Sequence, residues 1–198
     1  MTFSQTMQRY LAASTYIDFD TPDVLATARR LAGGATSDTD VARACFEFVR
    51  DEIRHSVDFK LNPVTCKASD VLRHGTGYCY AKSHLLAALL RANGIPAGLC
   101  YQRLSVGDSG APYCLHGLNA VWLKDAGWYR IDARGNKPGV EARFHPPVEK
   151  LAFATRTREE RMLPEIWAEP LPVVVEALEC YDTWDQVLAN LPDVVLLD

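Results

Sequence analysis

The sequence has no apolar stretch long enough to cross a bilayer, and its first residues lack the basic segment and apolar core of a secretory signal. It also has no internal repeat and no low-complexity tract. The formal net charge is only -4 at pH 7, so electrostatics gives no reason to expect nucleic acid or an anionic membrane as a partner. We therefore expect a cytoplasmic globular protein with no nucleic-acid or membrane partner.

The cysteines lack the dense spacing of a disulfide framework. Six are scattered over 198 residues, and a chain of this length can bury a core without covalent links. We expect free thiols, and we expect all but Cys79 to be small buried hydrophobic residues. Paired metal-ligand spacing is also missing, so a zinc site built from Cys79, Cys114 and His116, with His74 as a further ligand, is the less favoured alternative. We expect no metal and no cofactor.

Helix signals occupy the first half of the chain and strand signals the second. Capping and apolar spacing predict helices from Thr21 to the glycines at 33–34, from Ser37 to about 53, and from Tyr78 to Asn93, with Gly94 as the left-handed cap. The expected strands lie at 97–106, 115–123 and 127–132, with a late strand at 173–175. We also expect a loop at 55–67, a segment rich in proline and charge that wraps the surface at 137–172, and a last helix after Thr183.

This order of elements predicts an α+β fold with helices packed on an antiparallel sheet. We expect one domain over residues 1–198, with a helical part at 1–94 and a sheet-forming part at 95–198.

Cys79 is the most informative residue, because it lies where the glycine-rich turn at 75–77 enters a helix. A thiol is nucleophilic only as the thiolate, and the unpaired N–H groups at a helix N-terminus favour that anion. The same groups can hold the oxyanion of a tetrahedral intermediate. The position therefore predicts a nucleophile, although a buried structural cysteine remains an alternative.

His116 and Asp132 follow Cys79 in two successive predicted strands, in the chain order of a nucleophile, its base and the partner of that base. A two-residue loop at 125–126 would turn Asp132 to the wrong face of the sheet. A three-residue loop at 124–126 would place it on the face of His116, within reach of its side chain. A catalytic triad therefore requires an odd loop or a bulge here.

Four other residues are weaker candidates for substrate binding. Asn119 and Arg134 flank the proposed site, Tyr78 precedes the nucleophile, and Gln102 is a candidate oxyanion donor. Asn119 and Arg134 are equally consistent with a role at the edge of the sheet. Tyr78 fits the aromatic core better than the cleft, and nothing in the spacing of Gln102 requires the role of oxyanion donor.

The segment from Ala68 to Asn136, about a third of the chain, resembles the core of the transglutaminase-like superfamily of papain-fold thiol enzymes. The matching stretches lie at 68–72, 77–79, 89–97, 116–122 and 127–132, and the run LRANGIPA at 90–97 is the most specific of them. The resemblance implies Cys79 as nucleophile, His116 as base and Asp132 as its partner. It also implies a cysteine helix packed on the sheet that carries the other two residues.

The sequence leaves three functions open. The favoured one is a thiol enzyme acting on an amide or isopeptide bond, with a peptide or protein substrate and either water or an amine as acceptor. The second is a binding module that keeps the fold without turnover, as some members of the superfamily do. The third is the zinc protein described above.

Overall fold

The computed structural model describes residues 3–107 and 110–195. The helices are α1 (Phe3–Gln8), α2 (Pro22–Ala32), α3 (Asp38–Glu52), α4 (Ser56–Phe59), α5 (Ala68–His74), α6 (Cys79–Ala92), α7 (Pro172–Glu179) and α8 (Trp184–Ala189). The strands are β1 (Arg54–His55), β2 (Thr76–Gly77), β3 (Ala97–Ser105), β4 (Tyr113–Leu123), β5 (Gly127–Ile131) and β6 (Arg161–Met162). No helix in these ranges is both long and apolar enough to span a membrane.

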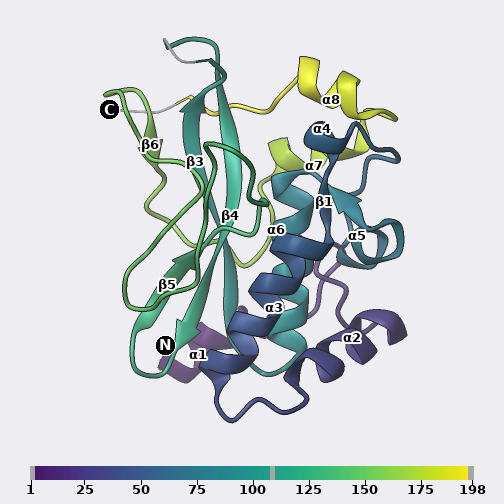
Figure 1. Cartoon of the computed structure of the whole chain (residues 1–198), viewed down its shortest axis with the longest axis vertical. Helices are drawn as coiled ribbons and strands as arrows, with labels where there is room; N and C mark the ends of the chain where they lie inside the picture. The colour runs from purple at the N-terminus through teal and green to yellow at the C-terminus, as the bar shows by residue number, and fades with distance from the viewer. Residues whose placement is uncertain (1–2, 108–109, 196–198) are drawn as a thin grey trace.

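The main sheet has four strands in the order β5-β4-β3-β6, and all of its pairings are antiparallel. Figure 1 shows this sheet on the left and most of the helices on the right, with α6 between them. The predicted α+β class with helices against an antiparallel sheet is therefore confirmed.

Helix α6 is the centre of the core. Thirteen of its 14 residues are buried, and it packs against α2, α3, α5, β3 and β4. Each fully buried leucine of this helix contributes about 1.5–3 kcal/mol to stability by leaving water. This burial fixes the first residue of α6, Cys79, relative to the sheet.

The local signals at helix ends were largely correct. The side chain of Ser37 accepts a hydrogen bond from the N–H of Asp40 at the start of α3. Thr183 and Gln186 form a capping box at the start of α8. Gly94, after α6, has a φ of 73°, a left-handed conformation that glycine adopts without steric cost.

Two parts of the predicted secondary structure were wrong. The apolar run Val173–Val175 lies in helix α7, because Pro172 occupies the first helical position and Leu171 is its N-cap. The predicted loop at 55–67 contains α4 and the end of β1. Strand β1 pairs in parallel with β2, placing His55 beside Gly77. The loop is therefore ordered next to the turn that precedes Cys79.

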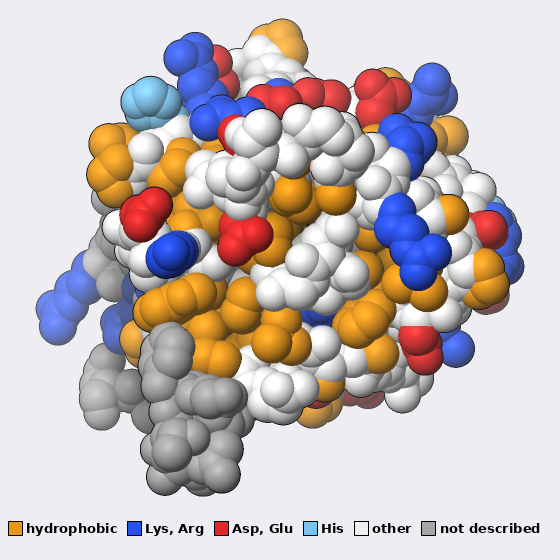
Figure 2. All heavy atoms as spheres, turned by 90° about the horizontal axis from the view of Figure 1, so that it is seen from below, with side chains coloured by type: hydrophobic (Ala, Val, Ile, Leu, Met, Phe, Trp, Pro, Cys, Tyr) orange, Lys and Arg blue, Asp and Glu red, His pale blue; other side chains and the backbone are white. Residues whose placement is uncertain are grey.

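The second face of the sheet is covered by the chain between β5 and α7, drawn in green in Figure 1. Cys100, Leu118 and Ala120 form a small apolar cluster on the sheet, against which Leu151 and Ile166 pack. This segment contains little regular structure besides β6. Seen from below, the surface carries hydrophobic patches between interspersed side chains of both charges (Figure 2).

Each of the six cysteines is a free thiol. Cys45, Cys66 and Cys100 are buried, as predicted, whereas Cys114 is half-buried and Cys180 is exposed. The expectation of burial was wrong for Cys180 because it follows α7 at the surface, as the C-cap residue.

Candidate active site

Cys79 is the first residue of α6, separated from the short strand β2 only by Tyr78. The side chain of its N-cap residue, Tyr78, forms no capping hydrogen bond within the described part of the chain. The first N–H groups of α6 therefore remain available to an anion. The thiol is 7% exposed, and its Sγ accepts a hydrogen bond from the backbone N–H of Gly117 at 3.4 Å.

Gly117 allows this close approach of α6 to β4. A Cβ at this position would lie 3.0 Å from both Cα and Cδ1 of Tyr80, closer than nine in ten real contacts of that kind. Glycine therefore lets the two elements bring the sulfur and the N–H together without displacing Tyr80.

The hairpin between β4 and β5 has the three-residue loop that a triad requires. Leu123 pairs with Gly127 and Asn119 with Ile131, so the loop consists of residues 124–126. In this register, His116 and Asp132 point to the same face of the sheet. His116 Nε2 and Asp132 Oδ2 are 2.8 Å apart, a normal hydrogen-bond distance.

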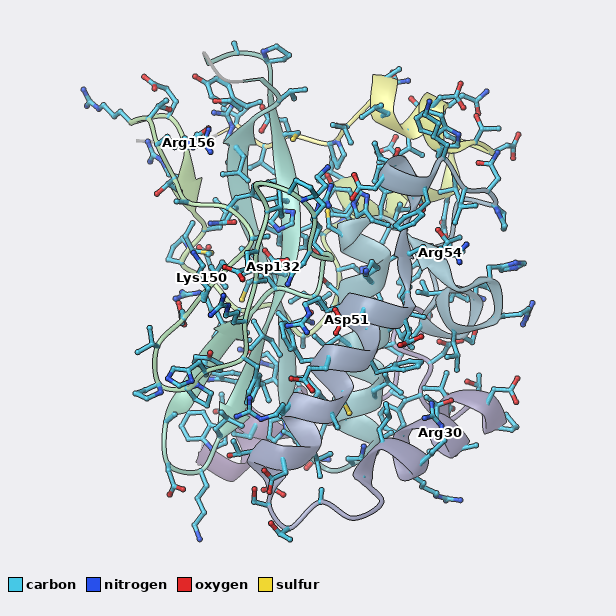
Figure 3. All side chains as sticks on the ribbon, viewed as in Figure 1. Arg30, Asp51, Arg54, Asp132, Lys150 and Arg156 are labelled. Atoms are coloured by element: carbon cyan, nitrogen blue, oxygen red, sulfur yellow. The ribbon has the colours of Figure 1, made fainter. Side chains whose placement is uncertain are left out.

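Asp132 is fully buried and accepts several hydrogen bonds. Besides His116, the backbone N–H groups of Ala152 and Arg134 donate to it, at 3.0 Å and 3.1 Å respectively. Burial favours the neutral acid, but the charge of His116 and these hydrogen bonds outweigh it, and the pKa of Asp132 is lowered. Asp132 is therefore ionised at neutral pH. Figure 3 shows it near the centre of the molecule.

His116 is held in its charged form. Burial alone would lower its pKa, but the charges of Asp132 and Cys79, with hydrogen bonds to both side chains, raise the pKa of His116 to about 10. Since Nε2 bonds to Asp132, Nδ1 is the nitrogen left for the sulfur. An imidazolium beside a thiol stabilises the thiolate.

The side chains of Cys79 and His116 line a cleft of about 290 Å³. One wall of the cleft carries His55, Asp58, Arg134 and Lys137. The ring of Phe153 meets that of His116 edge-on, with 5.0 Å between the ring centroids. Phe153 also lines a larger neighbouring hollow of about 1070 Å³, so its ring forms part of the partition between the two.

The structure brings two of the four weaker candidates to the cleft. Tyr78 and Arg134 line it, and the hydroxyl of Tyr78 donates to the carbonyl of Trp184. Gln102 lines the larger hollow instead, and its amide donates to the carbonyl of Phe153 at 3.2 Å.

Asn119 is not at the cleft, contrary to the prediction that it flanks the site as a substrate-binding residue. It is fully buried, and its side-chain N–H₂ donates to the carbonyls of Ser83 at 2.9 Å and Gly98 at 3.3 Å. Its side chain alternates to the core face of β4, where these bonds join α6 to β3.

Three residues near the site carry no local sequence signal of their role. Lys82 follows Cys79 by one helical turn and is 1% exposed, which is exceptional for a lysine. His55 lies in a segment predicted as loop. Phe153 comes from the irregular chain after β5, where only tertiary structure shows which side chains face inward.

A metal site has little support. No group of three or more His, Cys, Asp and Glu side chains in residues 3–107 and 110–195 has the arrangement to hold a metal ion. His74, named as a further zinc ligand, is exposed at the end of α5.

Comparison with known proteins identifies the superfamily of the chain. The family model of the transglutaminase-like superfamily matches residues 25–133. No curated protein matches the chain at a significant level.

Two solved structures share the fold. A candidate cysteine protease from Cytophaga hutchinsonii aligns with a TM-score of 0.52 at 20% identity, over 65% of this chain and 42% of that one. The periplasmic domain of TgpA from Pseudomonas aeruginosa aligns with a TM-score of 0.51 at 20% identity, over 67% of this chain and 48% of that one. The chain therefore spans less than half the length of either protein.

Proposed function

This chain belongs to the transglutaminase-like superfamily, and we propose that it is a thiol-dependent enzyme acting on an amide or isopeptide bond. The class covers a cysteine peptidase, an amidase and an acyl transferase. The proposal rests above all on one observation: the buried pair of His116 and Asp132, joined at 2.8 Å, lies beside a thiol at the start of a helix.

In the proposed reaction, the thiolate of Cys79 attacks the carbonyl carbon of the amide and a C–S bond forms. The free N–H groups at the start of α6 stabilise the oxyanion. His116, as imidazolium, gives its proton to the departing amine as the C–N bond breaks.

The second half of the reaction releases the acyl group from Cys79. His116, now neutral, takes a proton from an incoming water or amine, which attacks the thioester carbonyl. Water completes hydrolysis and an amine completes transfer. Asp132 holds the imidazole in orientation and stabilises its charged form without taking the proton. A peptide or protein supplies the amide in either case, and no cofactor takes part in this scheme.

The alternative is a binding module that keeps the fold but not turnover. The reactivity of Cys79 distinguishes the two functions, because a structural thiol reacts only near its ordinary pKa of about 8.5.

The experiment measures alkylation of Cys79 by iodoacetamide from pH 5 to pH 9, read by peptide mapping. It uses a Cys180→Ser background, because Cys180 is exposed and competes for the reagent. We expect Cys79 to react well below pH 7, and His116→Ala to move the profile towards an ordinary thiol. His74→Ala is the matched control and should leave the profile unchanged. If Cys79 reacts like an ordinary thiol in both the background and His116→Ala, the enzyme is ruled out and the binding module is favoured.

A further inference from the structure

A cluster of charged residues forms part of the cleft wall near Cys79. Both Nη atoms of the Arg134 guanidinium donate hydrogen bonds to the carboxylate of Asp58, and Nη2 lies 3.0 Å from Oδ1. Lys137 Nζ donates to the same Oδ1 at 2.7 Å. Two cations therefore share one carboxylate, and the cluster keeps a net positive charge.

Asp58 is ionised, so it cancels only one of the two positive charges of Arg134 and Lys137. Burial opposes its ionisation, but hydrogen bonds from Arg134 and Lys137 outweigh burial and lower the pKa of Asp58 to about 2. The side chain of Lys137 is 42% exposed. An ammonium has three donors, and only one of them is needed for the bond to Asp58.

His55 adds a second, independent observation. It is 7% exposed and lines the cleft, yet its Nδ1 has no hydrogen-bond partner among the described residues. Asp58 Oδ2 is 3.9 Å from this nitrogen, too far for a hydrogen bond. A buried polar atom without a partner costs about 1–3 kcal/mol, a penalty that a bound ligand would remove.

The positive charge of Arg134 also acts on two neighbouring side chains, His55 and Lys82. Burial is the first cause that lowers the pKa of His55 and of Lys82, and the charge of Arg134 is the second for both. A bound anion would offset this charge.

We propose that Lys137 and His55 form a subsite for a carboxylate carried by the substrate, next to the amide that Cys79 attacks. The inference rests on the proposed function and narrows its substrate class to peptides with an acidic group close to the scissile amide. The carboxylate accepts from the remaining donors of the Lys137 ammonium, and the imidazole of His55 lines the same cleft. Arg134 stays paired with Asp58 and supplies the long-range attraction.

The first test compares two alkylating reagents of nearly the same size, iodoacetate and iodoacetamide, on Cys79 in the Cys180→Ser background. Only iodoacetate carries a carboxylate. The ratio of the two rates, taken within each variant, reports attraction of an anion to the cleft and cancels differences in thiol reactivity. Removing one nearby charge is expected to change this ratio about two- to fivefold at low salt.

Three variants test the direction in which the ratio of the two rates changes. Lys137→Gln should lower it, because an ammonium leaves the cleft. Asp58→Asn should raise it, because the compensating carboxylate is gone. Lys150→Gln makes the same charge change at an exposed residue that lines only the larger hollow, and it should leave the ratio unchanged. An equal fall in Lys137→Gln and Lys150→Gln, or no change in any variant, would overturn the subsite.

The second test distinguishes the two sources of a carboxylate. Binding to a Cys79→Ala variant is measured by calorimetry for acetyl-Ala-Ala-Glu-amide, acetyl-Ala-Ala-Gln-amide and acetyl-Ala-Ala-Gln with a free C-terminus. Tighter binding of the first peptide indicates an acidic side chain, and tighter binding of the third indicates a C-terminal carboxylate. A gain that Lys137→Gln abolishes supports the proposal, whereas equal affinities, including undetectable binding of all three, contradict it.

These tests are separable from the proposed function. If Cys79 reacts slowly with both reagents, the enzyme proposal fails, while the ratio still reports whether the cleft attracts an anion. If Cys79 is highly reactive but the ratio is insensitive to Lys137, the enzyme proposal stands and the subsite fails.

Discussion

The carboxylate of Asp132 has more hydrogen-bond donors around it than a triad requires. Oδ2 accepts from His116 Nε2 and from the N–H of Ala152, and Oδ1 accepts from the N–H of Arg134. An asparagine at this position must turn its amide group towards at least one of these donors. The residue therefore holds together the end of β5 and the segment that covers the sheet, besides orienting the imidazole.

Asp132→Asn is expected to cut turnover by about two to four orders of magnitude, because the amide favours the wrong imidazole tautomer. The sequence alone predicts a nearly unchanged melting temperature for this variant. The buried N–H groups change that expectation to a loss of about 1–3 kcal/mol, the usual cost of an unsatisfied buried donor. Chemical denaturation measures the loss of stability, and Cys79 alkylation on the same preparation measures the thiol reactivity on which turnover depends.

Asp193→Asn is the matched control for that variant. Asp193 pairs with Arg103 and its side chain is 32% exposed, so the same substitution there should cost at most about 1 kcal/mol. Unchanged Cys79 reactivity in Asp132→Asn, with the stability loss present, would reduce Asp132 to a structural residue.

At the scale of elements, the contact between α6 and β4 sets the position of the thiol. Gly117→Ala would place a methyl group 3.0 Å from the backbone and ring of Tyr80. Because backbone atoms cannot rotate away, we expect a loss of about 1–3 kcal/mol and slower alkylation of Cys79. In Gly107→Ala, the new Cβ meets no described atom within 4 Å, and this control should be neutral. Equal stability of the two variants would contradict the close approach.

Lys82 joins α6 to the end of α3, where its amino group donates to the carbonyl of Ile53. Burial, with the charge of Arg134 second, lowers the pKa of Lys82 from 10.5 to about 7. Between those pH values the unfolded chain binds a proton that the folded chain does not. Unfolding therefore takes up a proton, and the contribution of Lys82 to the free energy of unfolding rises with pH through this window.

Lys82→Met should remove this dependence. We expect the wild-type free energy of unfolding to gain roughly 3–5 kcal/mol relative to the variant between pH 7 and pH 10.5. His116 acts in the opposite direction, because its pKa is raised and its contribution is lost as pH rises towards 10, but it is common to both proteins. Lys124→Met, in the exposed hairpin loop, is the control. Parallel pH profiles for wild type and Lys82→Met would show that Lys82 is charged in the folded state.

At the scale of the whole molecule, the two halves predicted from the sequence share one core. Helix α6 belongs to the first half but packs on β3 and β4 of the second. We therefore predict a single cooperative unfolding transition in calorimetry, and no stable fold for fragment 1–94 or fragment 95–198 alone. Two resolved transitions, or a dispersed NMR spectrum of either fragment, would mean that the halves are separate domains.

The sequence by itself determined the elements that depend on neighbouring residues. Helix caps at Ser37 and Thr183, the stop at Gly94 and the start of α6 at Cys79 are local, since each depends on hydrogen bonds within a few residues. The chain order of Cys79, His116 and Asp132 was also readable, because strand alternation allows only one loop parity to bring the last two together.

Tertiary structure decided everything that depends on distant parts of the chain. It selected the three-residue loop over the two-residue one, turned Asn119 into the core, and buried Lys82. It also joined Asp58 to Arg134, which are 76 residues apart, and laid Phe153 against His116. These features follow from which surfaces pack and which polar groups find partners in the folded chain, and no local pattern of residues encodes that choice.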